Sequence, residues 1–261
     1  MVGRDNGWNY RLFTERGGEI EADGFELMMV KPYYERLREL VSAIEKCGLY
    51  FGSIHAEKDI GIYLAGQNPG DTEEGFRLFA LNCNVGSAIG ASKLVLHLWS
   101  GRVSDTRLSS NISCLDRLFE IAGENSLELL IENVPSVESD AFSNLCRVSA
   151  SRPDAGFVYD VRFGAFHAQN EEIVSSGWLE NGRIRHLHIS DYTGPSGDFS
   201  SLRPILHPGQ GIAGLEKLLP EIFSVYHSTV TLESPDIHPE GFDASVINRD
   251  MDFIRKYSAS R

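Results

Sequence analysis

Cysteine is scarce in this sequence, and its four cysteines lie far apart. They are Cys47, Cys83, Cys114 and Cys146. No pair forms a CxxC motif, so neither a sulfur-rich metal site nor a secreted domain built on disulfides is expected. The pattern favours reduced, half-buried thiols in a reducing, cytoplasmic compartment.

Long apolar runs and basic residues are scarce as well. No segment approaches the roughly 20 apolar residues that cross a bilayer. The N-terminal stretch Met-Val-Gly-Arg-Asp-Asn-Gly lacks the apolar core of a signal peptide. The chain has 24 lysines and arginines against 37 aspartates and glutamates, which gives a formal net charge of −13. That charge repels a phosphate backbone, so broad nucleic-acid binding is disfavoured, and the lack of a long apolar run disfavours a membrane span.

Short apolar runs recur along the chain, and most of them end on a histidine or a carboxylate. The polar ends are His55, His97, Glu132, Asp160, His188 and Glu233. Each interval between them has room for a strand, a helix and two loops, and this alternation calls for a parallel sheet. With 261 residues the chain suits one (β/α)8 TIM barrel, a single domain over residues 1–261.

Seven strands are visible in the pattern, rather than eight. They are Phe25–Val30, Tyr50–Ile54, Leu94–Trp99, Leu127–Glu132, Phe157–Asp160, Arg185–Asp191 and Thr229–Glu233. Helices are expected between them, among them Tyr34–Cys47, Asp71–Ala91, Asn111–Ile121, Gly214–Phe223 and Ser245–Tyr257. Residues 1–23 carry no clear strand signal, and Trp8–Phe13 is a weak candidate for the eighth strand. A barrel that lacks a regular first strand is therefore predicted, with a gap at the N-terminal edge.

The stretch Arg185–Asp191 carries two histidines on one face of a strand. His186 lies about 7 Å deeper along the strand than His188, so packing inside the barrel is its expected role. Ligand histidines usually donate their second N–H to an acceptor, and Asp191 is predicted to orient His188 in this way. In a barrel the ends of the strands carry the active site.

The strand ends resemble those of the xylose isomerase-like barrels, which include sugar phosphate isomerases and epimerases, ketose 3-epimerases and endonuclease IV. The resemblance runs from Gly24 to Tyr257 and rests on the order and spacing of several fragments. These are Ser-Ile-His55, Leu-His97-Leu, Ile-Glu132-Asn, Tyr-Asp160-Val, His186-Leu-His188-Ile-Ser-Asp191, His207-Pro-Gly-Gln-Gly211 and Leu-Glu233-Ser.

The resemblance implies one divalent metal bound by Glu132, Asp160, His188 and Glu233. Three carboxylates and one imidazole favour Mn²⁺, Mg²⁺ or Co²⁺, and Zn²⁺ is compatible with them. The implied activity is that of an isomerase or epimerase, which moves a proton next to the carbonyl of a sugar or sugar phosphate. Glu132 and Glu233 are then the catalytic acid–base pair.

Four further residues are predicted to bind the substrate. They are His55, His97, His207 and Asp191. Two alternatives stay open for His55 and His97: they hold a second metal with Glu132, or they are hydrogen-bonded core histidines. The segment from His207 to Gly211 precedes a helix, where its backbone either binds phosphate or serves only the turn.

Two departures from the family pattern concern histidines. Many members have a histidine three residues after Asp160, where this chain has Phe163, and His167 is a candidate substitute. Phe163 and Ile205 also stand where endonuclease IV holds a third metal. Together with the net charge, this weighs against an endonuclease IV-like phosphodiesterase.

A polyol dehydratase on the same scaffold and a catalytically disabled barrel are further alternatives. The missing first strand is the support for a disabled barrel, and it leaves open whether Met1 is the natural start. An assembly of identical chains is also left open.

Overall fold

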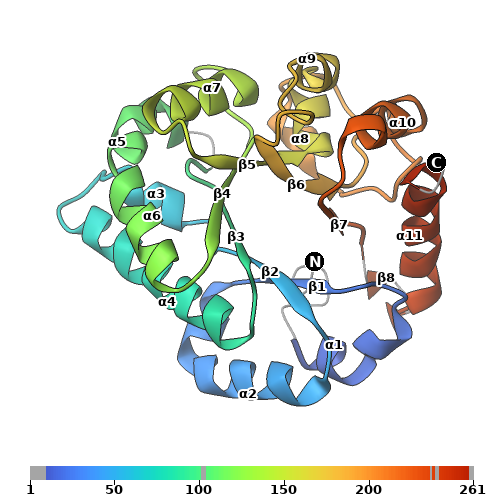
Figure 1. Ribbon diagram of the computed structural model, residues 1–261, viewed down its shortest axis with the longest axis horizontal. Coiled ribbons are helices and arrows are strands. Elements are labelled where there is room, and N and C mark those ends of the chain that lie inside the picture. Colours follow the sequence, from blue (N-terminus) through green and yellow to red (C-terminus); the bar gives the residue numbers. More distant parts are fainter. Residues whose placement is uncertain (1–9, 101–103, 236, 239–240, 259–261) are drawn as a thin grey trace.

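The computed structural model describes residues 10–100, 104–235, 237–238 and 241–258. Seven strands in this part of the chain form one parallel sheet, in which each strand pairs with its neighbours in sequence (Figure 1). They are β1 (Phe25–Met28), β2 (Phe51–His55), β3 (Lys93–Leu96), β4 (Glu128–Glu132), β5 (Gly156–Asp160), β6 (Ile184–Ile189) and β7 (Thr229–Leu232). The strands expected from the sequence are confirmed, with small shifts at their ends.

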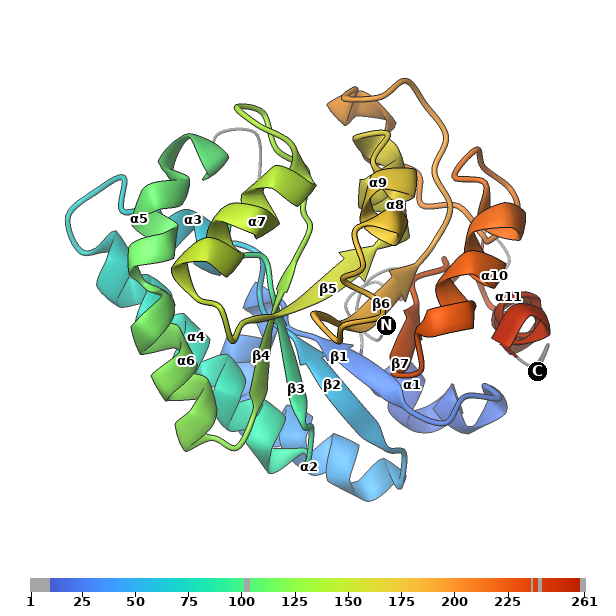
Figure 2. The same cartoon turned by 45° about the horizontal axis from the view of Figure 1, so that its top comes forward.

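Helices surround the sheet, and those on the left of Figure 2, α4 and α6, cover β3 and β4. The helices are α1 (Tyr10–Arg16), α2 (Leu37–Cys47), α3 (Ile60–Leu64), α4 (Asp71–Ala88), α5 (Leu108–Ser113), α6 (Leu115–Glu124), α7 (Ala141–Ser151), α8 (Val161–Phe166), α9 (Asn170–Ser175), α10 (Leu215–Val225) and α11 (Ala244–Ser258). A short hairpin pairs β8 (Ile237–His238) with β9 (Gly241–Phe242). None of the helices in the described part of the chain is long and apolar enough to cross a lipid bilayer.

The sheet stays open between β1 and β7, which share no backbone ladder among the described residues. The segment Trp8–Phe13 does not supply an eighth strand there, because α1 begins at Tyr10; Trp8 and Asn9 lie outside the described residues. The helix forms because Tyr10 and Phe13 lie on one helical face and are both buried. For residues 10–23 and the rest of the described chain, the prediction of a barrel without a regular first strand is confirmed.

The barrel interior differs from the main apolar core, which lies between the sheet and the helices. Val95, Leu130 and Val158 form a small separate cluster inside the barrel. Each lies two residues before a polar residue, His97, Glu132 or Asp160, and so shares the inner face of the sheet with it. The interior beside β1 and β6 is polar, with Glu26 and His186 both buried.

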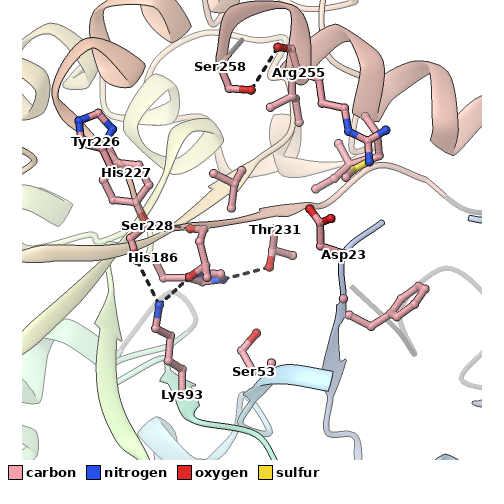
Figure 3. A pocket seen from close by; sticks show the side chains of 18 of the residues that line it. Asp23, Ser53, Lys93, His186, Tyr226, His227, Ser228, Thr231, Arg255 and Ser258 are labelled. Atoms are coloured by element: carbon pink, nitrogen blue, oxygen red, sulfur yellow. Dashed lines mark hydrogen bonds between the residues drawn. The ribbon is translucent and has the colours of Figure 1, made fainter. Parts of the chain in front are cut away.

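A cavity of about 540 Å³ opens beside the gap, at the N-terminal ends of the strands (Figure 3). Phe25, Lys93, His186 and Thr229 are among the residues that line it, together with parts of α10 and α11. This cavity lies at the opposite end of the barrel from the polar strand ends. It reaches the interior from the N-terminal ends of the strands, which we call the bottom of the barrel.

Candidate metal centre

The four predicted metal ligands come together at the C-terminal ends of β4, β5, β6 and β7. One ligand atom from each of Glu132, Asp160, His188 and Glu233 lies within 4.8 Å of the others. All four side chains are buried. The parallel register sets Asp160 of β5 beside His188 of β6, so the ends of neighbouring strands meet in one place.

Asp160 is held so that one of its carboxylate oxygens faces the centre. Its Oδ1 accepts the backbone N–H groups of Arg162 at 2.7 Å and Phe163 at 3.1 Å, which caps α8. Asn133 accepts the Asp160 N–H at 2.6 Å and donates to its carbonyl at 3.1 Å. Asp160 Oδ2 accepts no hydrogen bond from the described residues. A buried carboxylate oxygen in this state is costly, and a cation would remove the cost.

The electrostatics of the centre also favour a cation. Burial raises the pKa of Asp160 to about 7, with Glu233 and Glu132 adding to the rise and Arg162 and His188 opposing it. Three buried carboxylates so close together repel each other. A divalent cation bound among them would relieve that repulsion.

The ring of His188 faces carboxylates on both sides. Its Nδ1 lies 2.7 Å from Glu132 Oε1 and 3.2 Å from Glu233 Oε1, and its Nε2 lies 3.2 Å from Glu26 Oε1. Burial by itself lowers the pKa of His188, but Glu26 and Glu132 outweigh burial and raise it well above the ordinary value. Carboxylate and imidazole donors suit Mn²⁺, Mg²⁺, Co²⁺ or Zn²⁺, so these residues fit a divalent cation.

His55, His97 and Glu132 form a second group whose ligand atoms lie within 4.8 Å of one another. His55 Nδ1 donates to Ala56 O at 2.8 Å, which turns its Nε2 toward Glu132 Oε2 at 3.4 Å. His97 Nε2 contacts the same oxygen. Burial lowers the pKa of His97 to about 3 against the pull of Glu132. The second-metal alternative therefore has geometric support, and the substrate-binding role of both histidines stays a prediction.

Asp191 organises the loop after β6 and does not orient His188. Its two carboxylate oxygens accept four backbone N–H groups at 2.8–3.1 Å, those of Tyr192, Gly209, Gly211 and Ala213. The prediction that it orients His188 is wrong, because Glu26 faces His188 Nε2 while Glu132 and Glu233 face Nδ1. Contact of Asp191 with a substrate stays a prediction.

The loop containing His207 serves the turn. The N–H groups of Gly209 and Gly211, which the phosphate alternative would need, already point at Asp191. His207 Nδ1 lies 2.6 Å from Asp250 Oδ2 on α11, so its ring ties this loop to the last helix. Substrate binding by His207 stays a prediction.

Gly211→Ala is expected to destabilise the protein by about 1–3 kcal/mol, the usual cost of overpacking. An added Cβ would collide with the Tyr192 carbonyl oxygen and the Asp191 carboxylate. The free energy of unfolding in urea measures the effect. Gly123→Ala is the control, because nothing lies within 4 Å of a Cβ at that position in α6. Equal stabilities of the two variants would contradict the role given to Asp191.

Two residues close to the centre are not evident from the sequence pattern: Glu26 and Arg162. Arg162 is buried, with Nη2 at 3.8 Å from Asp160 Oδ2 and 4.0 Å from Glu233 Oε2. Its guanidinium lies 4.4 Å from the centre of the Phe163 ring. Its only signal in the sequence is its position two residues after the end of β5. Arg162 places a positive charge and planar N–H donors beside Asp160 and the predicted catalytic Glu233.

His167 does not replace the histidine that is absent at Phe163. Its Nε2 accepts the backbone N–H of Ser136 at 3.0 Å, and its ring lies against Phe166. Phe163 itself packs edge-on against His97, with ring centroids 6.2 Å apart. The position of the absent histidine is therefore apolar.

Metal affinity is expected to rise with pH. Protons on Asp160, whose pKa is about 7, and on His188, whose pKa is raised, compete with the cation. Both protons leave as the pH rises, so affinity gains about tenfold per pH unit for each proton released. Titration calorimetry in buffers of different ionisation enthalpy measures affinity and proton release together. Binding that releases no proton would contradict this assignment.

Comparison with known proteins gives one family match over most of the chain. The sequence profile described as xylose isomerase-like TIM barrel matches residues 17–257. No curated protein matches the chain in sequence.

Several solved structures share the fold at low sequence identity. The 3-keto-D-glucoside 4-epimerase YcjR from E. coli is 15% identical, with a TM-score of 0.68 over 93% of this chain and 92% of its own. The IolI protein with a binding zinc atom is 18% identical, with a TM-score of 0.70 over 98% and 95%. A D-allulose 3-epimerase from Methylomonas sp., in complex with D-allulose, is 14% identical, with a TM-score of 0.71 over 98% and 93%. At such identities the likeness shows the fold alone.

Proposed function

Because this chain belongs to the xylose isomerase-like TIM barrel family, we propose that it is a divalent-metal-dependent isomerase or epimerase of a sugar or sugar phosphate. One observation carries the proposal. Four buried ligand atoms of Glu132, Asp160, His188 and Glu233 lie within 4.8 Å of one another where the strands end. Epimerases among the structures of similar fold support the substrate class.

The chemistry proposed is proton transfer next to a carbonyl. A bound cation would polarise the substrate oxygens, an effect worth several kcal/mol as negative charge develops. Glu132 and Glu233 extend from strands on different sides of the centre. One removes the proton from the substrate carbon and the other returns it, and each contributes about 10²–10⁴-fold. Arg162 is placed to donate hydrogen bonds to a substrate oxygen near Glu233.

The test uses purified protein loaded with Mn²⁺, Mg²⁺, Co²⁺ or Zn²⁺ and a panel of ketoses and their phosphates in heavy water. The expected result is conversion of at least one ketose with deuterium at the carbon next to the carbonyl, and loss of conversion on chelation. A dehydratase would instead release water from a cyclic polyol, so polyols belong in the panel. A protein that binds metal and converts none of these compounds would favour the disabled barrel.

A metal-dependent phosphodiesterase is the second candidate function. The group of His55, His97 and Glu132 favours it, because it offers a second cation site that shares Glu132 with the first. The net charge of −13 and the apolar Phe163 weigh against it. Metal content decides between the two, since the isomerase or epimerase proposal expects about one equivalent per chain rather than two. Cytoplasmic location and assembly of identical chains stay predictions.

A further inference from the structure

A column of polar side chains crosses the barrel interior beneath the metal centre. Lys93 Nζ donates to Thr229 Oγ1 at 2.6 Å, and this oxygen lies 2.7 Å from His186 Nδ1. His186 Nε2 lies 3.3 Å from Glu26 Oε2, and Glu26 Oε1 lies 3.2 Å from His188 Nε2. Figure 3 shows the lower part of this column, with Lys93 and His186 at the wall of the cavity. Glu26 and both histidines are buried, so bulk solvent does not compete for their hydrogen bonds.

The carboxylate of Glu26 sets the hydrogens in the lower part of the column. A carboxylate only accepts, so His186 Nε2, which lies 3.3 Å from Glu26 Oε2, carries a hydrogen, and Thr231 Oγ1 at 3.0 Å is a second acceptor for it. His186 Nδ1 then accepts the hydroxyl hydrogen of Thr229, whose oxygen also accepts from Lys93.

Glu26 sets the protonated nitrogen of His188 in the same way. A carboxylate only accepts, and Glu26 Oε2 receives the Ser53 hydroxyl at 2.8 Å and faces His188 Nε2 at 3.4 Å. His188 must then place a hydrogen on Nε2. A second hydrogen, on Nδ1, faces Glu132 and Glu233, and it is the one that a cation bound among these carboxylates would displace.

We propose that Glu26 is the positioning residue that makes His188 a metal ligand through Nδ1. This inference rests on the proposed metal-dependent function. The Nε2–H bond to Glu26 fixes both the tautomer and the ring orientation, and it increases the basicity of the ligand nitrogen. His186, fixed by Thr229 and Thr231, holds Glu26 from below.

A separate metal site at Glu26 is the competing interpretation, because Glu26, His186 and His188 also bring ligand atoms within 4.8 Å of one another. A cation there would need the Nε2 lone pairs of both histidines. The group at Glu26 offers a divalent cation one carboxylate, whereas the centre of Glu132, Asp160, His188 and Glu233 offers three, so we assign the cation to that centre and the supporting role to Glu26.

Zn²⁺, which is diamagnetic, is the probe for the test. Long-range proton–nitrogen NMR of the histidine rings should show His188 with a hydrogen on Nε2 and Zn²⁺ on Nδ1; His188→Asn identifies its signals. Glu26→Gln should weaken Zn²⁺ binding by about 10–100-fold, the usual cost of losing such a partner. Its amide should also leave His188 in a mixture of tautomers.

Glu128→Gln is the matched control, since it removes the same charge from the far end of β4, where Glu128 pairs with Arg185. It should keep the affinity and the single tautomer of the unchanged protein. Zn²⁺ on Nε2 of His188, or equal affinities of the Glu26→Gln and Glu128→Gln variants, would overturn the role of Glu26 while leaving the metal centre intact. A chain that binds no Zn²⁺ would overturn the proposed function as well. The NMR measurement on the unchanged protein decides the matter even if Glu26→Gln fails to fold.

Discussion

Replacing Glu132 or Glu233 with glutamine is expected to lower turnover at least about 10²-fold. Glutamine keeps an oxygen that can face a cation but cannot accept a proton from carbon. Metal binding should weaken only moderately, because one carbonyl oxygen remains at each position. Steady-state kinetics on the ketose identified above, with metal content measured on the same samples, gives both quantities.

Isotope exchange in the two variants distinguishes a two-base epimerase from a one-base isomerase, which the loss of turnover by itself does not. In a two-base epimerase, the surviving glutamate still exchanges the substrate proton with heavy water from its own face of the sugar, and no product forms. In a one-base isomerase, one variant loses exchange entirely and the other keeps it. Glu128→Gln, on the same strand as Glu132 but at its other end, is the control and should retain full turnover. Full turnover in both active-site variants would refute the proton-transfer mechanism and leave only the metal centre.

Asp160→Asn is expected to have opposite effects on the metal-free and the metal-loaded protein. The pKa of Asp160 is raised to about 7, so above pH 7 its carboxylate is charged. Because this charge is buried, it lowers the free energy of unfolding. The sign follows from linkage: a carboxyl whose folded pKa lies above its unfolded pKa loses stabilising protonation as the pH rises. Asparagine removes that cost and keeps an Oδ1 acceptor for the N–H groups that cap α8. The metal-free variant should therefore be more stable by on the order of 2 kcal/mol at about pH 8.

The same change should weaken metal binding moderately, as in the two glutamine variants, because a neutral amide oxygen replaces a charged ligand oxygen. Urea unfolding without and with Zn²⁺ measures both effects on one sample, since a ligand stabilises the state that binds it. At low pH the stability difference between the metal-free proteins should vanish, because Asp160 is then protonated. A metal-free variant that is less stable at high pH would mean that an ion pair with Arg162 outweighs the burial of the charge.

The strand ends were predictable from the sequence alone. A βα repeat forces neighbouring strands to run parallel, so residues that close successive strands must meet at one end of the barrel. The rule brings His55, His97, Glu132, Asp160, His188 and Glu233 to the same end of the barrel, and the resemblance to the family implies that the last four are the metal ligands. The rule needs only the period of the chain and the ends of its apolar runs, and both are visible in one sequence.

Only the tertiary structure placed Glu26 beside His188, 162 residues away along the chain. Alternation along β1 puts Glu26 on one face of a strand, but the curvature of the whole sheet decides which side chain it meets across the interior. The same holds for Asp191, which the sequence predicts to be the last residue of a strand. Its carboxylate turned to four backbone N–H groups of the following loop, because the loop folds back over it. The pattern of a strand determines which of its residues share a face, whereas their partners depend on how the sheet curves and where the loops return.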